Sequence, residues 1–161
     1  MYYSNHIFRS NVPDEGGNAA GDEKMQTAGV LHMSYMDIVK MTLTKEELIY
    51  EELDECVLSI SWEDKTILIA AQEEKECLQV VGRARVGLPA EKRPAAYELM
   101  NSLNEEELVQ CFLDANGDLK VSQILVLADS VLSKNMVLTT LGHIWRALEA
   151  GFEPLMKLRY S

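Results

Sequence analysis

The chain has 161 residues, of which 15 are Lys or Arg and 26 are Asp or Glu, and 47% of its residues are hydrophobic. This length and apolar content suit one compact domain with some chain to spare, and not two domains. The formal net charge of −11 argues against nucleic-acid binding, which draws its affinity from clustered basic side chains.

Residues 1–41 are expected to form a flexible leader. The stretch 11–24 contains one Pro, three Gly and no aromatic residue. It cannot bury enough apolar surface to offset the entropy of ordering it. Residues 30–41 are more apolar, and two alternatives stay open for them: a short helix, or an arm that docks on the domain or on a partner.

A single folded domain is predicted over residues 42–161, beginning with a helix at residues 45–55. Thr44 followed three residues later by Glu47 has the pattern of a capping box, which starts a helix. A narrow apolar stripe runs along the same segment. It consists of Leu48, Ile49 and Leu53.

Three strands are expected next, at residues 57–62, 66–71 and 77–86. The first two flank the polar tripeptide 63–65, a pattern typical of a hairpin. The charged segment 72–76 is expected to turn the chain into the third strand.

A second helix is predicted over residues 91–104, where apolar residues recur at helical spacing. Two more strands are expected at residues 108–113 and 119–128. Asn116 and Gly117 lie between them, and Asn-Gly is a strong hairpin signal because both residues tolerate positive φ.

A long amphipathic helix closes the chain, with Ser133 as its expected N-cap. Gly151 and Pro154 predict a bend or break near its end. The resulting order α-β-β-β-α-β-β-α predicts an α+β fold, an antiparallel sheet of about five strands with helices packed on one face.

The sequence argues against a membrane-spanning protein, a secreted protein and a nucleotide-binding protein. The apolar runs are far shorter than the roughly 20 residues of a transmembrane helix, and the first ten residues lack the apolar region of a secretory signal. Glycine-rich phosphate-binding motifs are absent from the sequence, so we expect no cofactor. We therefore expect a cytoplasmic protein that makes no membrane contact.

The cysteines are odd in number and widely spaced, which disfavours disulfides and a zinc site. They are Cys56, Cys77 and Cys111.

Reactive side chains form no recognisable catalytic motif. His6, His32 and His143 lack metal-ligand spacing, so no metal site is expected. Cys111 and His143 could act as nucleophile and base, but nothing in their spacing supports this. An enzyme is therefore the least favoured alternative.

Asn101 and Asn104 lie three residues apart on one face of the second predicted helix, where asparagine is unfavourable for helix formation. Two roles stay open for them. They cap the end of the helix through their side chains, or they contact a binding partner.

The segment Asn101-Ser102-Leu103-Asn104, followed by the turn Asp114-Ala115-Asn116-Gly117-Asp118, gives residues 42–157 a resemblance to the YbjN family. That family resembles the bacterial type III secretion chaperones in fold. The order of elements and the closing amphipathic helix support the resemblance. Ser102 and Leu103 depart from it, because the family often places an aromatic residue there.

The resemblance implies a small, acidic, cytoplasmic and non-enzymatic bacterial protein, often dimeric. It also implies a link to regulation or to chaperone-like protein binding, and it brings no catalytic residues. A sheet covered on one face leaves the other face open, and the strand at 119–128 is too apolar to stay in water. We therefore expect a homodimer, since a two-fold contact uses one patch twice.

The favoured function is a module that holds a segment of a partner protein. Residues 44–76 carry 11 acidic and three basic side chains. They form either a solvated surface or a patch that attracts a basic segment. Trp62, Trp145 and Phe152 are candidate contact aromatics, with core packing as the alternative for each. A signalling or transcription-linked regulator without chaperone activity is the second hypothesis.

Overall fold

The structure is a computed structural model that describes residues 33–106, 108–128 and 130–161. Over these residues the longer elements follow the order α-β-β-β-β-α-β-β-α, and short 3₁₀ turns precede β4 and α2. The elements are α1 (Tyr35–Lys45), β1 (Glu51–Asp54), β2 (Val57–Trp62), β3 (Lys65–Gln72), β4 (Cys77–Ala84), α2 (Arg93–Glu106), β5 (Gln110–Leu113), β6 (Leu119–Val126) and α3 (Lys134–Tyr160).

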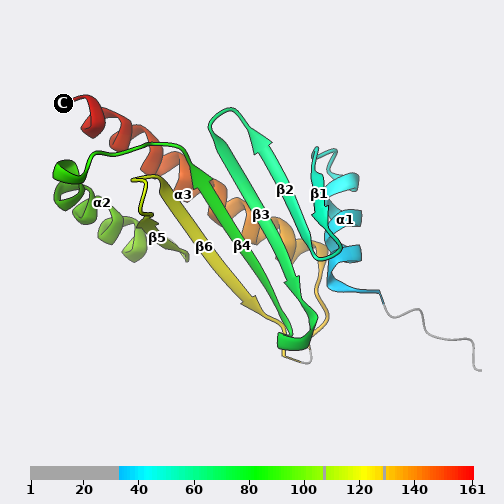
Figure 1. The fold of residues 1–161 in the computed structure, drawn as a ribbon. Coiled ribbons are helices and arrows are strands. Elements are labelled where there is room, and N and C mark those ends of the chain that lie inside the picture. Colours follow the sequence, from blue (N-terminus) through cyan, green and yellow to red (C-terminus); the bar gives the residue numbers. More distant parts are fainter. Residues whose placement is uncertain (1–32, 107, 129) are drawn as a thin grey trace, which may run out of the picture. The chain divides into compact units, whose positions relative to one another are not determined.

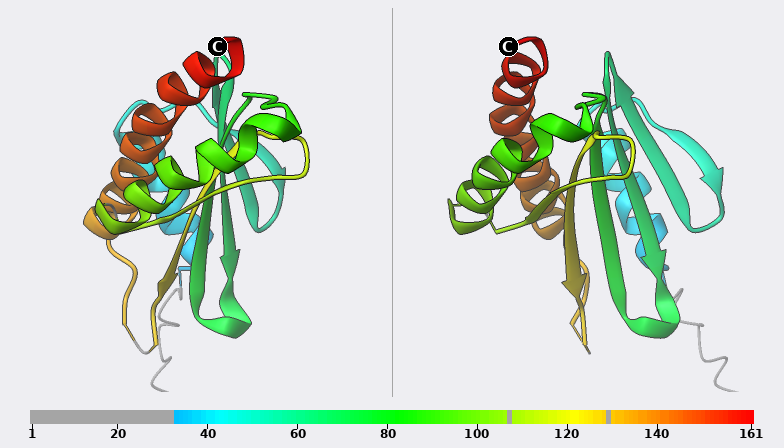
Figure 2. Two further views of the ribbon diagram at one scale, coloured as in Figure 1. Left: turned by 90° about the vertical axis from the view of Figure 1, so that its left-hand side faces the viewer. Right: turned by 60° about the vertical axis from the view of Figure 1, so that its left-hand side comes forward.

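The six strands form one antiparallel sheet in the order β1-β2-β3-β4-β6-β5 (Figure 1). The helices lie on one side of this sheet (Figure 2). α3 packs mainly on β4 and β6, α1 packs on α3 and β3, and α2 packs on α3 and β5. The predicted α+β class, with helices on one face of an antiparallel sheet, is confirmed.

The core lies between α3 and the inner face of the sheet, where alternate strand residues are buried. A Cβ atom added at Gly82 of β4 would lie 2.6 Å from Ile144 Cγ2 and 2.8 Å from Leu148 Cδ1. Only glycine therefore lets α3 approach β4 this closely. The other large buried side chains of the inner face include Leu58, Ile69, Leu78, Val80 and Leu119.

The closing helix begins as predicted, because the Ser133 side chain accepts a hydrogen bond from the Met136 N–H at 3.2 Å. It then continues through Gly151 and Pro154 to Tyr160, so it does not break there. A Cβ at Gly151 would lie 2.9 Å from Leu119 Cδ2. This glycine therefore serves close packing against the sheet.

The prediction of a helix at residues 45–55 is wrong, because α1 ends at Lys45 and β1 covers Glu51–Asp54. The capping box is formed ten residues earlier, where the Ser34 side chain accepts from the Asp37 N–H and the Asp37 carboxylate accepts from the Ser34 N–H, both at 3.1 Å. α1 ends at Lys45, and Glu47 has a left-handed φ of 57°. Residues 51–54 then pair with β2 as an additional edge strand.

Burial explains this difference. α1 carries a stripe of buried side chains that α3 and the sheet cover, whereas Leu48, Ile49 and Leu53 stay exposed. A helix at 45–55 would have buried only that narrow stripe. α1 begins inside the segment 30–41, for which a helix was one alternative. Residues 1–32 of the expected leader lie outside the described residues, so the extent of the leader stays a prediction.

None of the helices within the described ranges combines the length and hydrophobicity that a membrane-spanning helix requires.

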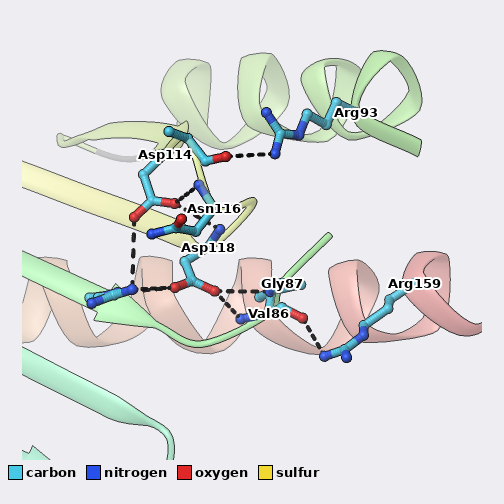
Figure 3. Close-up of polar contacts among 9 residues, drawn as sticks. Val86, Gly87, Arg93, Asp114, Asn116, Asp118 and Arg159 are labelled. Atoms are coloured by element: carbon cyan, nitrogen blue, oxygen red, sulfur yellow. Dashed lines mark hydrogen bonds and ion pairs between the residues drawn. The ribbon is translucent and has the colours of Figure 1, made fainter. Parts of the chain in front are cut away.

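A buried carboxylate holds the β5–β6 hairpin to the chain that follows β4 (Figure 3). Asp118 accepts hydrogen bonds from the Val86 and Gly87 N–H groups, both at 2.9 Å, and from the Arg83 guanidinium at 2.5 Å. Its side chain is 5% exposed. Burial raises the pKa of Asp118, but the hydrogen bonds from Arg83 and the two backbone groups outweigh burial and hold the pKa below its ordinary value.

Replacing Asp118 with Asn retains the shape of the side chain and removes its charge. We expect D118N to lower the free energy of unfolding at pH 7 by about 1.5–3 kcal/mol in urea denaturation, because the buried hydrogen bonds to the carboxylate are charge-assisted. A depressed folded-state pKa stabilises the fold above the ordinary value of 3.8 and ceases to do so as the pH falls through the folded-state pKa. The difference between wild type and D118N should therefore shrink in acid.

The matched control is Glu153→Gln, which removes an exposed ion pair with Lys157. We expect a smaller change for E153Q because solvent screens that pair. Equal losses in the two variants, or a D118N difference that does not vary with pH, would contradict this account of the hairpin.

Candidate functional site

The largest cavity that we describe is an apolar groove of about 640 Å³ between α3 and the β2 end of the sheet. We call it the Trp groove, because Trp62 of β2 and Trp145 of α3 both line it. The other apolar lining comes from the chain between α1 and β1, from the inner face of the sheet and from α3. These side chains are Leu48, Ile49, Ile60, Ile67, Leu138 and Leu141.

Two stacked indole rings form part of the lining of the groove. The ring centroids of Trp62 and Trp145 are 3.7 Å apart, with an angle of 30° between the planes. Trp62 is half-buried and Trp145 is 39% exposed. The sequence contains only these two tryptophans. The structure thus brings together two of the aromatics predicted to contact a partner, although they lie 83 positions apart in the chain.

The groove exists because β1 covers only half of β2. The β1–β2 ladder pairs Glu51 with Ser59 and ends there, while β3 pairs with the whole of β2 as far as Trp62. The second half of β2, Ile60–Trp62, therefore has a strand on one side only. The chain between α1 and β1 turns at Glu47, where φ is 57°, and the apolar residues Leu48 and Ile49 that follow line the groove.

The side of the groove formed by the chain around β1 is acidic. Glu47 lines the groove, and all four residues of β1 are exposed, three of them acidic. One of these carboxylates is compensated: Glu52 accepts a hydrogen bond from Lys40 at 2.6 Å, and this bond raises the pKa of the Lys40 ammonium. On the α3 side, Arg146 contributes a cation to the lining.

Phe152 lies two helical turns beyond Trp145 on α3 and is half-buried against the core. The ammonium of Lys65 lies 4.7 Å from the centroid of its ring and 3.1 Å from Glu149 Oε1. Lys65 is itself buried and pairs with Trp62 in the β2–β3 ladder. Phe152 therefore contacts the strand partner of Trp62 and is not among the residues that line the Trp groove.

The two asparagines lie elsewhere, on α2, which contributes no lining residue to the groove. Asn104 accepts a hydrogen bond from the Cys111 N–H at 2.6 Å and donates one to the Cys111 carbonyl at 3.1 Å, so it fastens α2 to β5. This is a side-chain contact to backbone groups of a neighbouring strand. Asn101 is exposed on the same helix. Partner contact by Asn101, Asn104 or Phe152 stays a prediction.

Cys111 and His143, the pair considered for catalysis, are placed differently. Cys111 is buried in β5, whereas His143 is half-buried on α3 and lines a separate small cavity beside Gln123. Across the described ranges, no group of three His, Cys, Asp or Glu side chains is arranged to hold a metal ion.

Sequence reasoning missed Leu48, Ile49, Leu138 and Leu141 as groove residues. The spacing of Leu48 and Ile49 predicts a helical stripe, although a short segment of three residues, Leu48 to Tyr50, between two acidic pairs also fits an exposed connection. Leu138 and Leu141 belong to the long stripe of α3, and nothing in the sequence distinguishes groove residues from core residues there.

The comparisons with known proteins agree with one another. A family model described as "YbjN: Putative bacterial sensory transduction regulator" matches residues 36–149. No curated protein matches the chain.

The fold is similar to that of several solved structures. E. coli YbjN is 18% identical, with 76% of this chain and 89% of that chain covered and a TM-score of 0.56. An uncharacterized protein from Methanothermobacter thermautotrophicus is 16% identical, with 77% and 98% covered and a TM-score of 0.58. A chain of the ExsC-ExsE complex is 15% identical, with 79% and 97% covered and a TM-score of 0.55. The predicted resemblance to the fold of the YbjN family is confirmed by the similarity to the solved YbjN structure.

The stacked indoles should be visible in solution by circular dichroism. Because exciton coupling needs both rings, we expect Trp62→Phe and Trp145→Phe each to abolish the whole coupled indole signal. Tyr97→Phe, a conservative change on the exposed face of α2, should leave it intact. If each tryptophan variant removed about half of the signal, the two rings would not be stacked.

Proposed function

The chain belongs to the YbjN family, and from that premise we propose that it is a non-enzymatic protein-binding module whose Trp groove holds an extended segment of a partner protein. The observation that carries this proposal is the stacked, partly exposed Trp62–Trp145 pair in an apolar groove. Partly exposed tryptophans beside an apolar cavity are typical anchors of protein interfaces.

The shape of the groove favours an extended segment. The strand β1 does not extend beside Ile60–Trp62 of β2. A strand from a partner therefore has room to continue the ladder there. Alternate side chains of such a strand point to opposite faces, and one set would enter the apolar groove. The volume of about 640 Å³ accommodates only a few side chains.

Charge favours a partner segment with basic residues. The strand nearest the groove carries Glu51, Glu52 and Asp54, and Glu47 lines the groove itself. Complementary charge of this kind accelerates encounter and selects partners more than it adds affinity. The ExsC-ExsE complex, whose fold is similar, shows two proteins bound to each other, which supports protein binding as the function of this fold.

We also propose that the protein acts as a homodimer, which the open apolar face of the sheet supports. A regulator that binds one defined partner, without chaperone activity, is the second candidate. The family description, which names sensory transduction, favours it. A chaperone-like module binds several segments that share the apolar and basic pattern, whereas such a regulator binds one.

A dye-labelled peptide in which Lys alternates with Leu or Val tests the groove directly by fluorescence anisotropy. We expect Trp145→Ala to weaken its binding about tenfold or more, because an interface anchor is lost. Tyr97→Ala, which removes an exposed aromatic from α2, should leave the affinity unchanged. Raising the ionic strength from about 0.01 M to 0.15 M should also weaken binding, since the Debye length falls from about 30 Å to about 8 Å.

The matched control peptide carries Glu in place of Lys and should bind poorly to this acidic surface. Equal affinities of the two peptides, or equal losses in the two protein variants, would show that the Trp groove is not the binding site.

A further inference from the structure

The face of the sheet that points away from the helices, which we call the outer face, carries no acidic residue on β2 to β6. Its residues are odd-numbered in β2 and β4 and even-numbered in β3, β5 and β6, as the ladder registers show. The whole chain has 26 Asp and Glu residues. On the outer face, acidic residues are therefore confined to the edge strand β1.

Apolar side chains occupy much of the outer face. Leu68 of β3 and Val81 of β4 pair at its centre, and Leu68 is 38% exposed. Ile124 of β6 is 60% exposed, with Val126 on the same strand and Phe112 on β5 also exposed. Within the described ranges no helix covers these residues, because α1, α2 and α3 lie on the opposite side of the sheet (Figure 2). An apolar face of this extent marks an interaction surface.

The strand order suits a two-fold contact with a second copy. Consider two copies packed face to face and related by a two-fold axis that runs parallel to the strands and passes between β3 and β4. This axis reverses the strand order β1-β2-β3-β4-β6-β5 in the second copy. It therefore places β4 over β3, β6 over β2 and β5 over β1 of the other copy. Lys120 of the outer face then lies on the same half of the interface as the acidic strand β1 of the partner copy. Arg83 beside it is already paired with Asp118 of its own chain, so burial of apolar side chains carries the contact.

The available area is sufficient for a specific dimer. Strands about 4.8 Å apart that rise about 3.3 Å per residue present about 16 Å² of sheet per residue. The six strands thus present about 600 Å² on each copy, and a face-to-face dimer buries about 1,200 Å² in total. This value lies at the lower end of the range for stable interfaces.

We infer that the outer face is the self-association surface and that a second copy of this chain covers it. The inference rests on the proposed homodimer and names the surface that forms it. Because the Trp groove lies on the helix side of the sheet, both grooves of such a dimer stay open to partner segments. Dimer formation and groove binding are therefore separable by mutation.

Light scattering of the full chain tests this inference. We expect the wild type to have about twice the mass of one 18.1 kDa chain at tens of micromolar. Leu68→Glu should reduce the mass to that of one chain, because it places a carboxylate opposite an apolar face. Val131→Glu is the control: this residue is 82% exposed in the connection before α3, and the variant should remain dimeric.

Ile124→Lys is the second variant on the outer face, and it decides the result if L68E does not fold by circular dichroism. A folded outer-face variant that stays dimeric, a monomeric wild type, or a V131E variant that also dissociates would overturn the inference. Trp145→Ala should stay dimeric, and L68E should still bind the Lys-rich peptide. Unchanged peptide binding in a dimeric W145A variant would overturn the groove proposal alone, and a folded, dimeric L68E variant that still binds the peptide would overturn the dimer inference alone.

Discussion

The close approach of α3 to β4 at Gly82 is the constraint on which the rest of the structure depends. Without a side chain at Gly82, Ile144 and Leu148 of α3 reach the backbone of the sheet. The neighbouring residue on the helix, Trp145, is then placed against Trp62 at the far end of β2. The same packing holds the helices on one side and leaves the other side of the sheet without cover. The pairing of the two tryptophans and the outer face of the sheet both depend on this contact.

Much of the fold could be predicted from sequence because its signals are local. The Asn116-Gly117 turn, the Ser133 cap and the alternating strands each depend on neighbouring residues. The predicted position of the first helix was wrong because two adjacent segments both carry a capping pattern. These are Ser34 with Asp37 and Thr44 with Glu47. Burial against α3 and β3 decides between them, and burial is a property of the assembled chain.

The sequence predicted the aromatic residues of the candidate site but not the groove that they line. Trp62 and Trp145 were singled out as aromatics, but nothing local indicates that they stack. The groove beside them arises from a missing length of strand next to β2, which no motif encodes. Asn104, also singled out, binds the backbone of Cys111 and so joins α2 to β5. Residues that make a groove by their arrangement are the hardest to find from sequence.

The central claim is that a partner segment lies against the paired tryptophans. Nuclear magnetic resonance tests it most directly, because the two tryptophan indoles give only two indole N–H signals. Titration of the full chain with the peptide of alternating Lys and apolar residues should shift both indole signals and leave the backbone signals of the outer face unmoved. Shifts confined to Leu68, Val81 and Ile124, with both indole signals unchanged, would contradict the account.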